Sequence, residues 1–336
     1  MTRPDPDPDP ERHHDHVAGL DDLVDRALRR DKGAVATLLG RFEDRRPEMA
    51  ASRADALAAI ERRRGPRAPA PVVGITGTPG SGKSSLVSRI GRRLIEERPE
   101  LSLAVVAVDP SSHVSGGALL GDRTRMRFPR GEPRLFFRSQ ASDTQLGGLG
   151  PATYQACRLL TELFDLVVVE TVGIGQSEVD VRHLADRVYL VLSPLGGDEV
   201  QFLKAGIIEV PHAFVLNKCD EPTAERSYQQ LRSSLWLARP FDGDDVVIHR
   251  TSARTGAGVD ELVDDVLLLV TSGSPSDPDA RTTYFYGRWV EDEWGRRGVV
   301  HLHAALGGAS AHLAASGGFE AAQQAFDRSF VETLGS

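Results

Sequence analysis

The sequence predicts an α/β fold built on a mostly parallel β-sheet, which is flanked by an N-terminal helical region and a C-terminal extension. Apolar, β-branched runs alternate with helical patterns from residue 72 to about residue 270. These runs are apolar throughout and do not alternate with polar residues, which indicates strands buried on both faces of a sheet covered by helices. The expected strands are 72–75, 103–108, 135–137, 166–169, 189–192, 213–216 and 246–249.

The N-terminal part divides into a tail and a helical region. Residues 1–16 alternate Pro with Asp and then carry His13, His14 and His16. A segment with so little apolar surface cannot bury a core, so we expect a disordered tail. Three neighbouring histidines are also compatible with metal binding, but a solvated tail is the simpler interpretation. From 17 to 71, apolar residues at helical spacing predict three helices (20–28, 35–42 and 49–64) and then a linker at 65–71.

The segment after the first expected strand has the phosphate-binding pattern G-x-x-x-x-G-K-S. The helix expected after it carries Leu86, Ile90 and Leu94 on one face. Glycines in such a loop let backbone N–H groups point at phosphate oxygens, while the lysine reaches the β- and γ-phosphates and the serine hydroxyl ligates Mg²⁺. The sequence therefore predicts a nucleoside triphosphate site that includes Gly77, Pro79, Gly80, Ser81, Gly82, Lys83 and Ser84.

Two later loops indicate which base is bound. The strand at 213–216 leads into Asn-Lys-Cys-Asp, and the strand at 246–249 is followed by Ser-Ala-Arg. A carboxylate accepts two hydrogen bonds, and guanine offers its N1–H and exocyclic amine side by side, whereas adenine has an acceptor in place of the N1–H. The second loop resembles the S-A-K loop whose backbone amide contacts the guanine oxygen, with Arg in place of the usual Lys. GTP is thus expected, with Asn217, Lys218, Asp220, Ser252, Ala253 and Arg254 around the base.

Composition agrees with a cytoplasmic enzyme. The chain has 336 residues and a net charge of −8, which gives no electrostatic footprint for nucleic acid or for an anionic membrane. No run reaches the apolar length of a membrane span. The two cysteines, Cys157 and Cys219, form neither a disulfide framework nor a metal-binding spacing.

Three further loops follow expected strands, at 109–126, 170–178 and 193–204. Glu170 closes an apolar strand and Gly173 follows three positions later, which is typical of a Walker-B and switch arrangement. There the carboxylate orders Mg²⁺-bound waters and the glycine amide contacts the γ-phosphate. Each loop alone is equally compatible with an ordinary polar strand end that carries a helix-capping Asp.

Read together, these loops resemble the MeaB/ArgK family of P-loop GTPases, which includes the human protein defective in one form of methylmalonic aciduria. The family string D-P-S-S…S-G-G…L-G-D-[KR]-T-R-M is similar to 109–126, E-T-V-G-[VI]-G-Q-S-E to 170–178, and P-x-x-G-D-E-x-Q-x-x-K to 194–204. The resemblance spans about 19–270 and implies a P-loop GTPase sheet of the signal-recognition/MinD class at 72–270. It also implies a homodimeric, metallochaperone-type GTPase. Such proteins serve adenosylcobalamin-dependent acyl-CoA mutases, gate cofactor delivery and protect the mutase.

The resemblance also implies roles for individual residues. Ser85 joins the residues that hold GTP or GDP, and the Gly173 amide meets the γ-phosphate. Lys204 belongs to the switch that moves when the mutase is bound. Ile174 stands where Ras-like proteins carry a water-positioning Gln, so hydrolysis is expected to be slow without a partner. The acidic and hydroxyl residues placed around Mg²⁺ are Ser84, Asp109, Asp122 and Glu170.

The C-terminal extension, 271–336, departs from the family pattern. Family members end in a helical dimerisation element, and this extension is a candidate for that role. The run from Val299 to Leu306 alternates and is expected to form a half-exposed strand, although His301 and His303 within it are also compatible with a metal site. The identity of the mutase stays open. Two alternatives remain: a nickel-insertion GTPase of the hydrogenase/urease accessory type, and a transport-linked kinase of the ArgK type.

Overall fold

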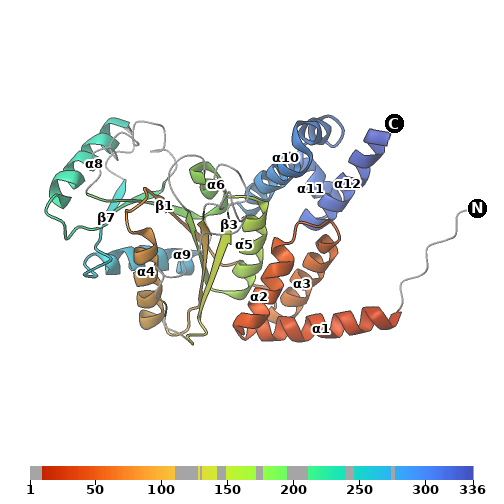
Figure 1. The fold of residues 1–336 in the computed structure, drawn as a ribbon, viewed down its shortest axis with the longest axis horizontal. Helices are drawn as coiled ribbons and strands as arrows, with labels where there is room; N and C mark the ends of the chain where they lie inside the picture. The colour runs from red at the N-terminus through yellow and green to blue at the C-terminus, as the bar shows by residue number, and fades with distance from the viewer. Residues whose placement is uncertain are drawn as a thin grey trace, which may run out of the picture.

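Seven parallel strands form one sheet in the order β3-β2-β4-β1-β5-β6-β7 (Figure 1). The structure is a computed structural model that describes residues 10–109, 128, 131–141, 149–171, 177–194, 211–238, 246–273 and 277–335, with the backbone alone at 10–18, 109, 177–179 and 335. Every strand pair in this sheet is parallel, which confirms the predicted fold class. The strands are β1 (Val72–Gly77), β2 (Leu103–Asp109), β3 (Leu135–Ala141), β4 (Leu166–Thr171), β5 (Arg187–Leu192), β6 (Ala213–Leu216) and β7 (Val247–Arg250).

Helices cover both faces of the sheet because both faces of its central strands are apolar. On β1, Val73 and Ile75 face the layer formed by α4 (Lys83–Glu97) and α9 (Val259–Ser272), while Val72 faces the opposite layer. That opposite layer begins with α5 (Pro151–Leu163) and α6 (Ser177–Leu184), and α8 (Ala224–Ala238) packs beside β5 and β6. The predicted two-sided burial is therefore correct.

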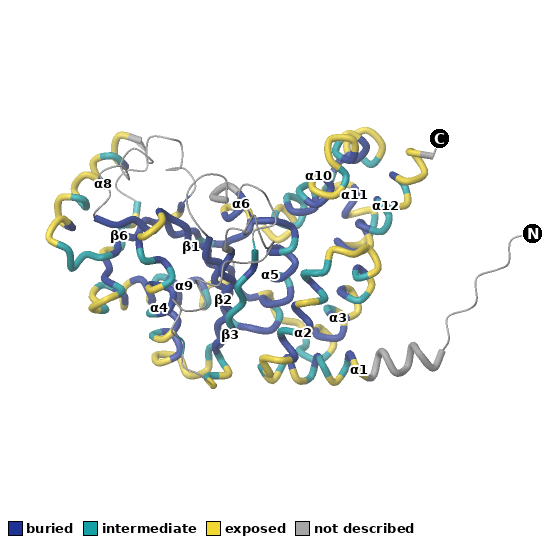
Figure 2. The backbone as a smooth tube through the Cα atoms, viewed as in Figure 1, coloured by how far each residue is buried: buried dark blue, intermediate teal, exposed yellow. Residues whose placement is uncertain are grey.

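The N-terminal and C-terminal helices pack on the same side of the molecule, outside α5 (Figure 1). Figure 2 shows α5 buried along most of its length, because one side faces the sheet and the other faces these helices. The ring of Tyr154 on α5 stacks on Phe285 with centroids 4.7 Å apart. The helices are α1 (Pro10–Leu28), α2 (Lys32–Glu43), α3 (Met49–Arg64), α10 (Pro278–Ala304), α11 (Ala309–Ser316) and α12 (Phe319–Gly335).

Helix α1 begins at Pro10, inside the segment 1–16 that we expected to be a disordered tail. Residues 10–16 are thus helical, and residues 1–9 lie outside the described part of the chain. Proline is tolerated in the first turn of a helix, where its missing N–H would have no intrahelical partner. The side chains of His13, His14 and His16 lie outside the described part as well, so metal binding there stays a prediction.

The expected strand from Val299 to Leu306 is wrong, because most of this run forms the end of α10. Val299, Leu302 and Leu306 pack on the core, and their spacing of three and four residues is helical. His301 is buried, and its Nε2 lies 2.9 Å from the Ser329 hydroxyl oxygen. Among the residues that the structure describes, no group of three or more potential metal ligands is found, and no helix is long and apolar enough to cross a membrane.

Helix α6, which follows the expected switch loop, is held by α10. The Tyr284 hydroxyl donates to Asp180 Oδ1 at 2.7 Å, and its ring stacks on His183 with centroids 3.7 Å apart. Arg288 Nε lies 3.9 Å from the same carboxylate. Asp180 is buried, and that burial raises its pKa. The C-terminal extension therefore contacts the helix nearest to the loop at 172–176, which itself lies outside the described residues.

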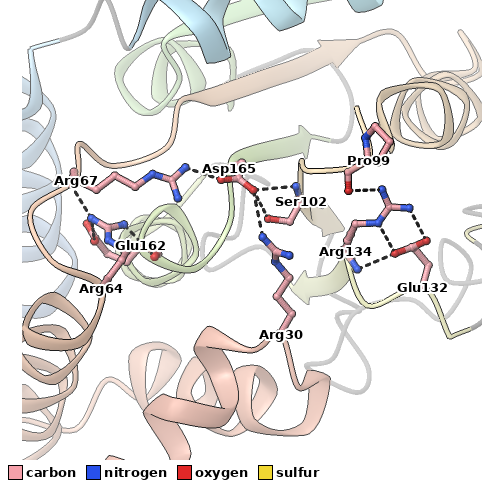
Figure 3. A network of polar contacts seen from close by, with 9 residues as sticks. All are labelled: Arg30, Arg64, Arg67, Pro99, Ser102, Glu132, Arg134, Glu162 and Asp165. Carbon is pink, nitrogen blue, oxygen red and sulfur yellow. Dashed lines mark hydrogen bonds and ion pairs between the residues drawn. The ribbon is translucent and has the colours of Figure 1, made fainter. Parts of the chain in front are cut away.

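A second carboxylate ties the helical region to the sheet (Figure 3). Asp165, between α5 and β4, accepts hydrogen bonds from the backbone N–H of Ser102 at 2.9 Å and from its hydroxyl at 2.6 Å. It also pairs with Arg67 of the linker at 2.5 Å and with Arg30, just after α1, at 3.5 Å. These contacts therefore fix the linker, which leads into β1, against the edge of the sheet at Asp165 and Ser102.

Asp186 offers a test of how the C-terminal extension is held. Its side chain is fully buried, and it accepts from the N–H of Val72 at 2.6 Å and from Arg281 of α10 at 2.5 Å. Asp186→Asn leaves the arginine without its counter-charge, so we expect a loss of about 3 kcal/mol in the free energy of unfolding, measured by urea titration. Asp260→Asn, at the exposed pair with Arg93, is the control and should change the midpoint little. Equal losses in the two variants would contradict a structural role for the Asp186 pair.

Candidate functional site

The phosphate-loop pattern lies between β1 and α4, at the carboxyl end of the sheet, as predicted. Gly77 has φ 142°, and a Cβ there would lie 2.0 Å from the carbonyl oxygen of Val191. Gly82 is left-handed with φ 90°, and a Cβ there would lie 2.6 Å from Asn217 Nδ2. Both positions therefore require glycine, because backbone or a buried amide occupies the space. Pro79 and Gly80 form the exposed apex of the loop, and Ser85 is exposed on the first turn of α4.

Lys83 is the first residue of α4, and its side chain runs back across the loop. Its Nζ donates to the carbonyl oxygens of Gly77 at 2.8 Å and Thr78 at 3.0 Å. The residue is buried, so the ammonium group is held inside the loop. Backbone N–H groups and a helix N-terminus beside a fixed cation form an arrangement suited to phosphate oxygens.

Ser84 and Glu170 meet at the head of the same loop. The Ser84 hydroxyl donates to Glu170 Oε1 at 2.7 Å, and Glu170 is buried on β4, which is paired with β1. Hydroxyl and carboxylate oxygens are the ligands that Mg²⁺ prefers, so these two side chains fit a magnesium site.

The other residues predicted around the metal are only partly described. Asp109 ends β2, the neighbour of β4, so its backbone reaches the same edge of the sheet, but nothing beyond its backbone is described. Asp122, Gly173 and Lys204 lie outside the described residues altogether. Their places around the phosphates therefore stay predictions.

Asn217 joins the predicted base loop to the phosphate loop. Its Nδ2 donates to the carbonyl oxygen of Ser81 at 2.8 Å. Its Oδ1 accepts from the N–H of Ala253 at 3.0 Å and from the Thr251 hydroxyl at 3.3 Å. The next residue, Lys218, has φ 60°, a left-handed conformation that is uncommon for a residue with a side chain. One buried amide thus fixes three segments that are far apart in the sequence.

Asp220 is oriented by the loop that follows β7. The Ser252 hydroxyl donates to its Oδ1 at 2.5 Å, and Arg254 forms an ion pair with its other oxygen. The hydrogen bond from Ser252 is the main cause that lowers the pKa of Asp220, so the group is a carboxylate at neutral pH. A base that uses both oxygens must displace the exposed Arg254 side chain.

Sequence reasoning missed two contributors to this site. Thr251 is fully buried and hydrogen-bonded to Asn217. Arg89 on α4 donates to the carbonyl oxygens of Ala253 at 3.2 Å and Arg254 at 2.9 Å, and so supports the second loop from beneath. Arg89 carried no signal in the sequence, since it looks like any arginine on the polar side of a helix.

The arrangement thus combines a phosphate loop with a buried lysine, a hydroxyl–carboxylate pair suited to Mg²⁺ and a carboxylate that is held by the Ser252 hydroxyl. The structure brings Lys83, Ser84 and Glu170 together, and it places the base-loop residues beside Ser81 through Asn217. This set can hold a nucleoside triphosphate along the carboxyl ends of β1, β4 and β6.

The chain is similar to several known proteins. The chain is 41% identical over 249 residues to a protein of Pyrococcus horikoshii named "Putative GTPase", a match that covers 72% of this chain and 75% of that protein. It is 37% identical over 205 residues to the mitochondrial methylmalonic aciduria type A homolog of Mus musculus, covering 57% of this chain and 47% of that protein. A solved structure described as LAO/AO transport system kinase matches with TM-score 0.58 and 25% identity, over 86% of this chain and 87% of that one.

A family model described as methylmalonyl-CoA mutase-associated GTPase MeaB matches residues 35–273. The matched span includes the phosphate loop, the Ser84–Glu170 pair and both base loops. The chain therefore belongs to the MeaB family of GTPases.

Proposed function

We propose that this protein binds and hydrolyses GTP with Mg²⁺ and assists an adenosylcobalamin-dependent acyl-CoA mutase, methylmalonyl-CoA mutase or a relative, by gating cofactor loading and protecting the mutase. The observation that carries the GTP part is the hydrogen bond from Asn217 to Ser81. It holds the loop that carries Asp220 at a fixed position beside the phosphate loop. The mutase part is supported by membership of a family described as mutase-associated and by the similarity to the mouse methylmalonic aciduria type A homolog.

In this proposal, guanine is read by Asp220. The carboxylate is ionised and pre-oriented by Ser252, so its oxygens face the N1–H and amine of the base once Arg254 has moved aside. The N–H of Ala253 already donates to Asn217 Oδ1, which fixes the second loop at the height of the base. Adenine has a lone pair at N1 and only a C–H at position 2, so it would offer Asp220 neither of the two hydrogen bonds.

Phosphate handling falls to the first loop. Lys83 exchanges its two carbonyl partners for β- and γ-phosphate oxygens, which its position inside the loop allows. Ser84 and Glu170 would hold Mg²⁺ or its waters, and a bound ion would supply positive charge next to the phosphoryl oxygens. With Ile174 beside Gly173, no glutamine is available to orient water at that position, so basal turnover is proposed to be slow.

Assembly and location are proposed on the same basis. We place the protein in the cytoplasm as a homodimer that uses its C-terminal extension, in line with the family resemblance.

The similar solved structure is described as a transport system kinase, so phosphate transfer to a protein must be distinguished from hydrolysis. Incubation with γ-labelled GTP and the mutase should release label as free phosphate. Label that stays on a protein would favour the kinase alternative.

The base assignment can be tested at Asp220. Asp220→Asn should weaken GTP binding by roughly 30- to 1000-fold, because a charged acceptor is lost and guanine donors are left unpaired. The same variant should bind xanthosine triphosphate better, since its C2 carbonyl accepts from the new amide. Titration calorimetry with both nucleotides measures this switch, and Glu225→Gln on α8 is the matched control. An unchanged preference for GTP would rule out Asp220 as the base reader.

The phosphate assignment can be tested at Lys83 and Ser84. Lys83→Ala should lower the GTP hydrolysis rate by at least about 100-fold, because the cation that faces the developing charge is removed. Ser84→Ala should abolish the dependence of GTP affinity on Mg²⁺. Free phosphate release and nucleotide binding with and without EDTA measure the two effects. Near-normal turnover by Lys83→Ala would mean that hydrolysis occurs at another site.

The mutase part can be tested at Lys204, whose position the structure does not describe. If this lysine supplies positive charge at the γ-phosphate when the mutase is bound, Lys204→Ala should remove most of the mutase-dependent acceleration of hydrolysis. Lys32→Ala at the start of α2 is the matched control and should keep the full acceleration. Rates are measured with and without saturating mutase. Equal acceleration in both variants would assign the stimulating charge to another group.

A further inference from the structure

A cavity of about 720 Å³ lies on the outer side of α5, away from the phosphate loop. Most of its wall comes from α3, from the linker before β1, from α5 and from the first turns of α10, and Leu184 at the end of α6 completes it. The linker in its wall leads into the amino end of β1, whereas the phosphate loop follows the carboxyl end of that strand. Its volume is within the range of small-molecule binding sites.

Four arginines line this cavity, one from each wall. They are Arg64 on α3, Arg67 in the linker, Arg158 on α5 and Arg281 on α10. The side chains of Arg64, Arg158 and Arg281 are only 12%, 22% and 16% exposed, while that of Arg67 is 48% exposed. Three of these guanidinium groups are largely removed from water. Burying them costs free energy unless negative charge lies nearby.

Each guanidinium group has a carboxylate partner, and three of these partners are not among the residues that line the cavity. Arg67 pairs with Asp165, Arg281 with Asp186 and Arg158 with Glu320, and none of these three acids lines the cavity. Only Arg64 is paired, at 2.7 Å, with an acid that lines it, Glu162, and Figure 3 shows this pair beside Arg67. The acids therefore orient the guanidinium groups, and the cavity surface itself carries more positive than negative groups: four arginines against Glu61 and Glu162.

Two of these acids are also shared with arginines outside the cavity. Asp165 accepts from Arg30 at 3.5 Å, and Glu320 Oε1 lies 3.9 Å from Arg53 Nε. Because each of these carboxylates is shared by two arginines, it neutralises less of the positive charge on the arginine that lines the cavity. Arg67, moreover, uses one of its five N–H donors in the contact with Asp165, so further donors of this exposed side chain can reach a ligand.

Most of the remaining cavity surface is apolar, although Thr161 and Thr282 also line it. Leu57, Pro69 and Leu184 line it, together with the ring of Tyr154. A ligand that fits must therefore combine an acid group with an apolar body. We propose that this cavity binds a small organic anion, a carboxylic acid or a phosphate monoester, with its acid group among the four guanidinium groups and its apolar part against α5 and the linker.

This site is separate from the nucleotide site and joins α3, α5 and α10, so an occupant bridges the N-terminal and C-terminal helices.

Three probes that each carry one ring distinguish which acid group the cavity binds: benzoate, phenyl phosphate and the uncharged benzyl alcohol. Binding to the full-length protein is measured by calorimetry and by the shift in melting temperature. Benzoate, phenyl phosphate or both should bind and raise the melting temperature, and the one that binds more tightly identifies the acid group. Benzyl alcohol should bind at least about tenfold more weakly than the better acid.

Variants locate the binding. Ala68→Trp places a large ring at the exposed linker position on the cavity wall and should abolish binding of the acid probes. Arg67→Gln should weaken it about tenfold, since an exposed side chain is changed and a charged donor is lost. Arg93→Gln, at a comparably exposed and paired arginine on α4, should leave it unchanged. Lys83→Ala should also retain it, because the phosphate loop is elsewhere.

The proposal would be overturned by no binding of either acid, by equal binding of the alcohol, or by binding that survives Ala68→Trp in a protein with unchanged circular dichroism. Loss of acid binding in Lys83→Ala alone would place the probe in the nucleotide site and also overturn it. None of these results depends on whether the protein hydrolyses GTP, so the two proposals stand or fall separately.

Discussion

The hydrogen bond between the Asn217 amide and the Ser81 carbonyl is the contact on which the nucleotide site depends. It is buried, and it joins a loop after β6 to a loop after β1 across the intervening strand β5. Gly82 can only be glycine because this amide occupies the place of its side chain. The same amide holds Ala253 and Thr251, so a single side chain sets the separation between phosphate loop and base loops. Losing it would leave the buried carbonyl of Ser81 and the partly buried N–H of Ala253 without their partner, at a cost of roughly 1–3 kcal/mol for the buried group.

Helix α5 has a comparable role for the rest of the molecule. It faces the sheet on one side, and α2, α3 and α10 pack on the other, so segments from both ends of the chain form one continuous core with the sheet. Partly buried ion pairs, such as Arg281 with Asp186 and Arg158 with Glu320, fix the C-terminal helices against this core. The N-terminal helices, α5 and the C-terminal helices therefore contribute buried side chains to one shared core, although the sequence suggests separate regions.

The sequence predicted what is encoded locally. Continuous apolar runs located all seven strands to within about two residues at most ends, because burial on both faces leaves a direct trace in residue type. The loop patterns likewise identified Lys83, Ser84 and Glu170, which the structure brings together. The run at 299–306 was misread, since an apolar residue at every second position and one at every third or fourth can coexist in so short a segment. Contacts such as Arg89 with the second base loop depend on how distant helices pack, and single residues do not reveal them.

The contact between α6 and α10 has a consequence for what the C-terminal helices can do. Tyr284 donates a hydrogen bond to Asp180 and stacks on His183, and both residues lie one to two helical turns beyond the loop that follows Glu170. A partner that binds α10 and alters this contact changes the conformational free energy of α6. In the same way, a change in the position of α6 changes the affinity of α10 for that partner. Thermodynamic linkage makes the two effects equal in size. If nucleotide binding repositions α6, a protein docked on the C-terminal helices would change nucleotide affinity by the same factor by which the nucleotide changes its docking.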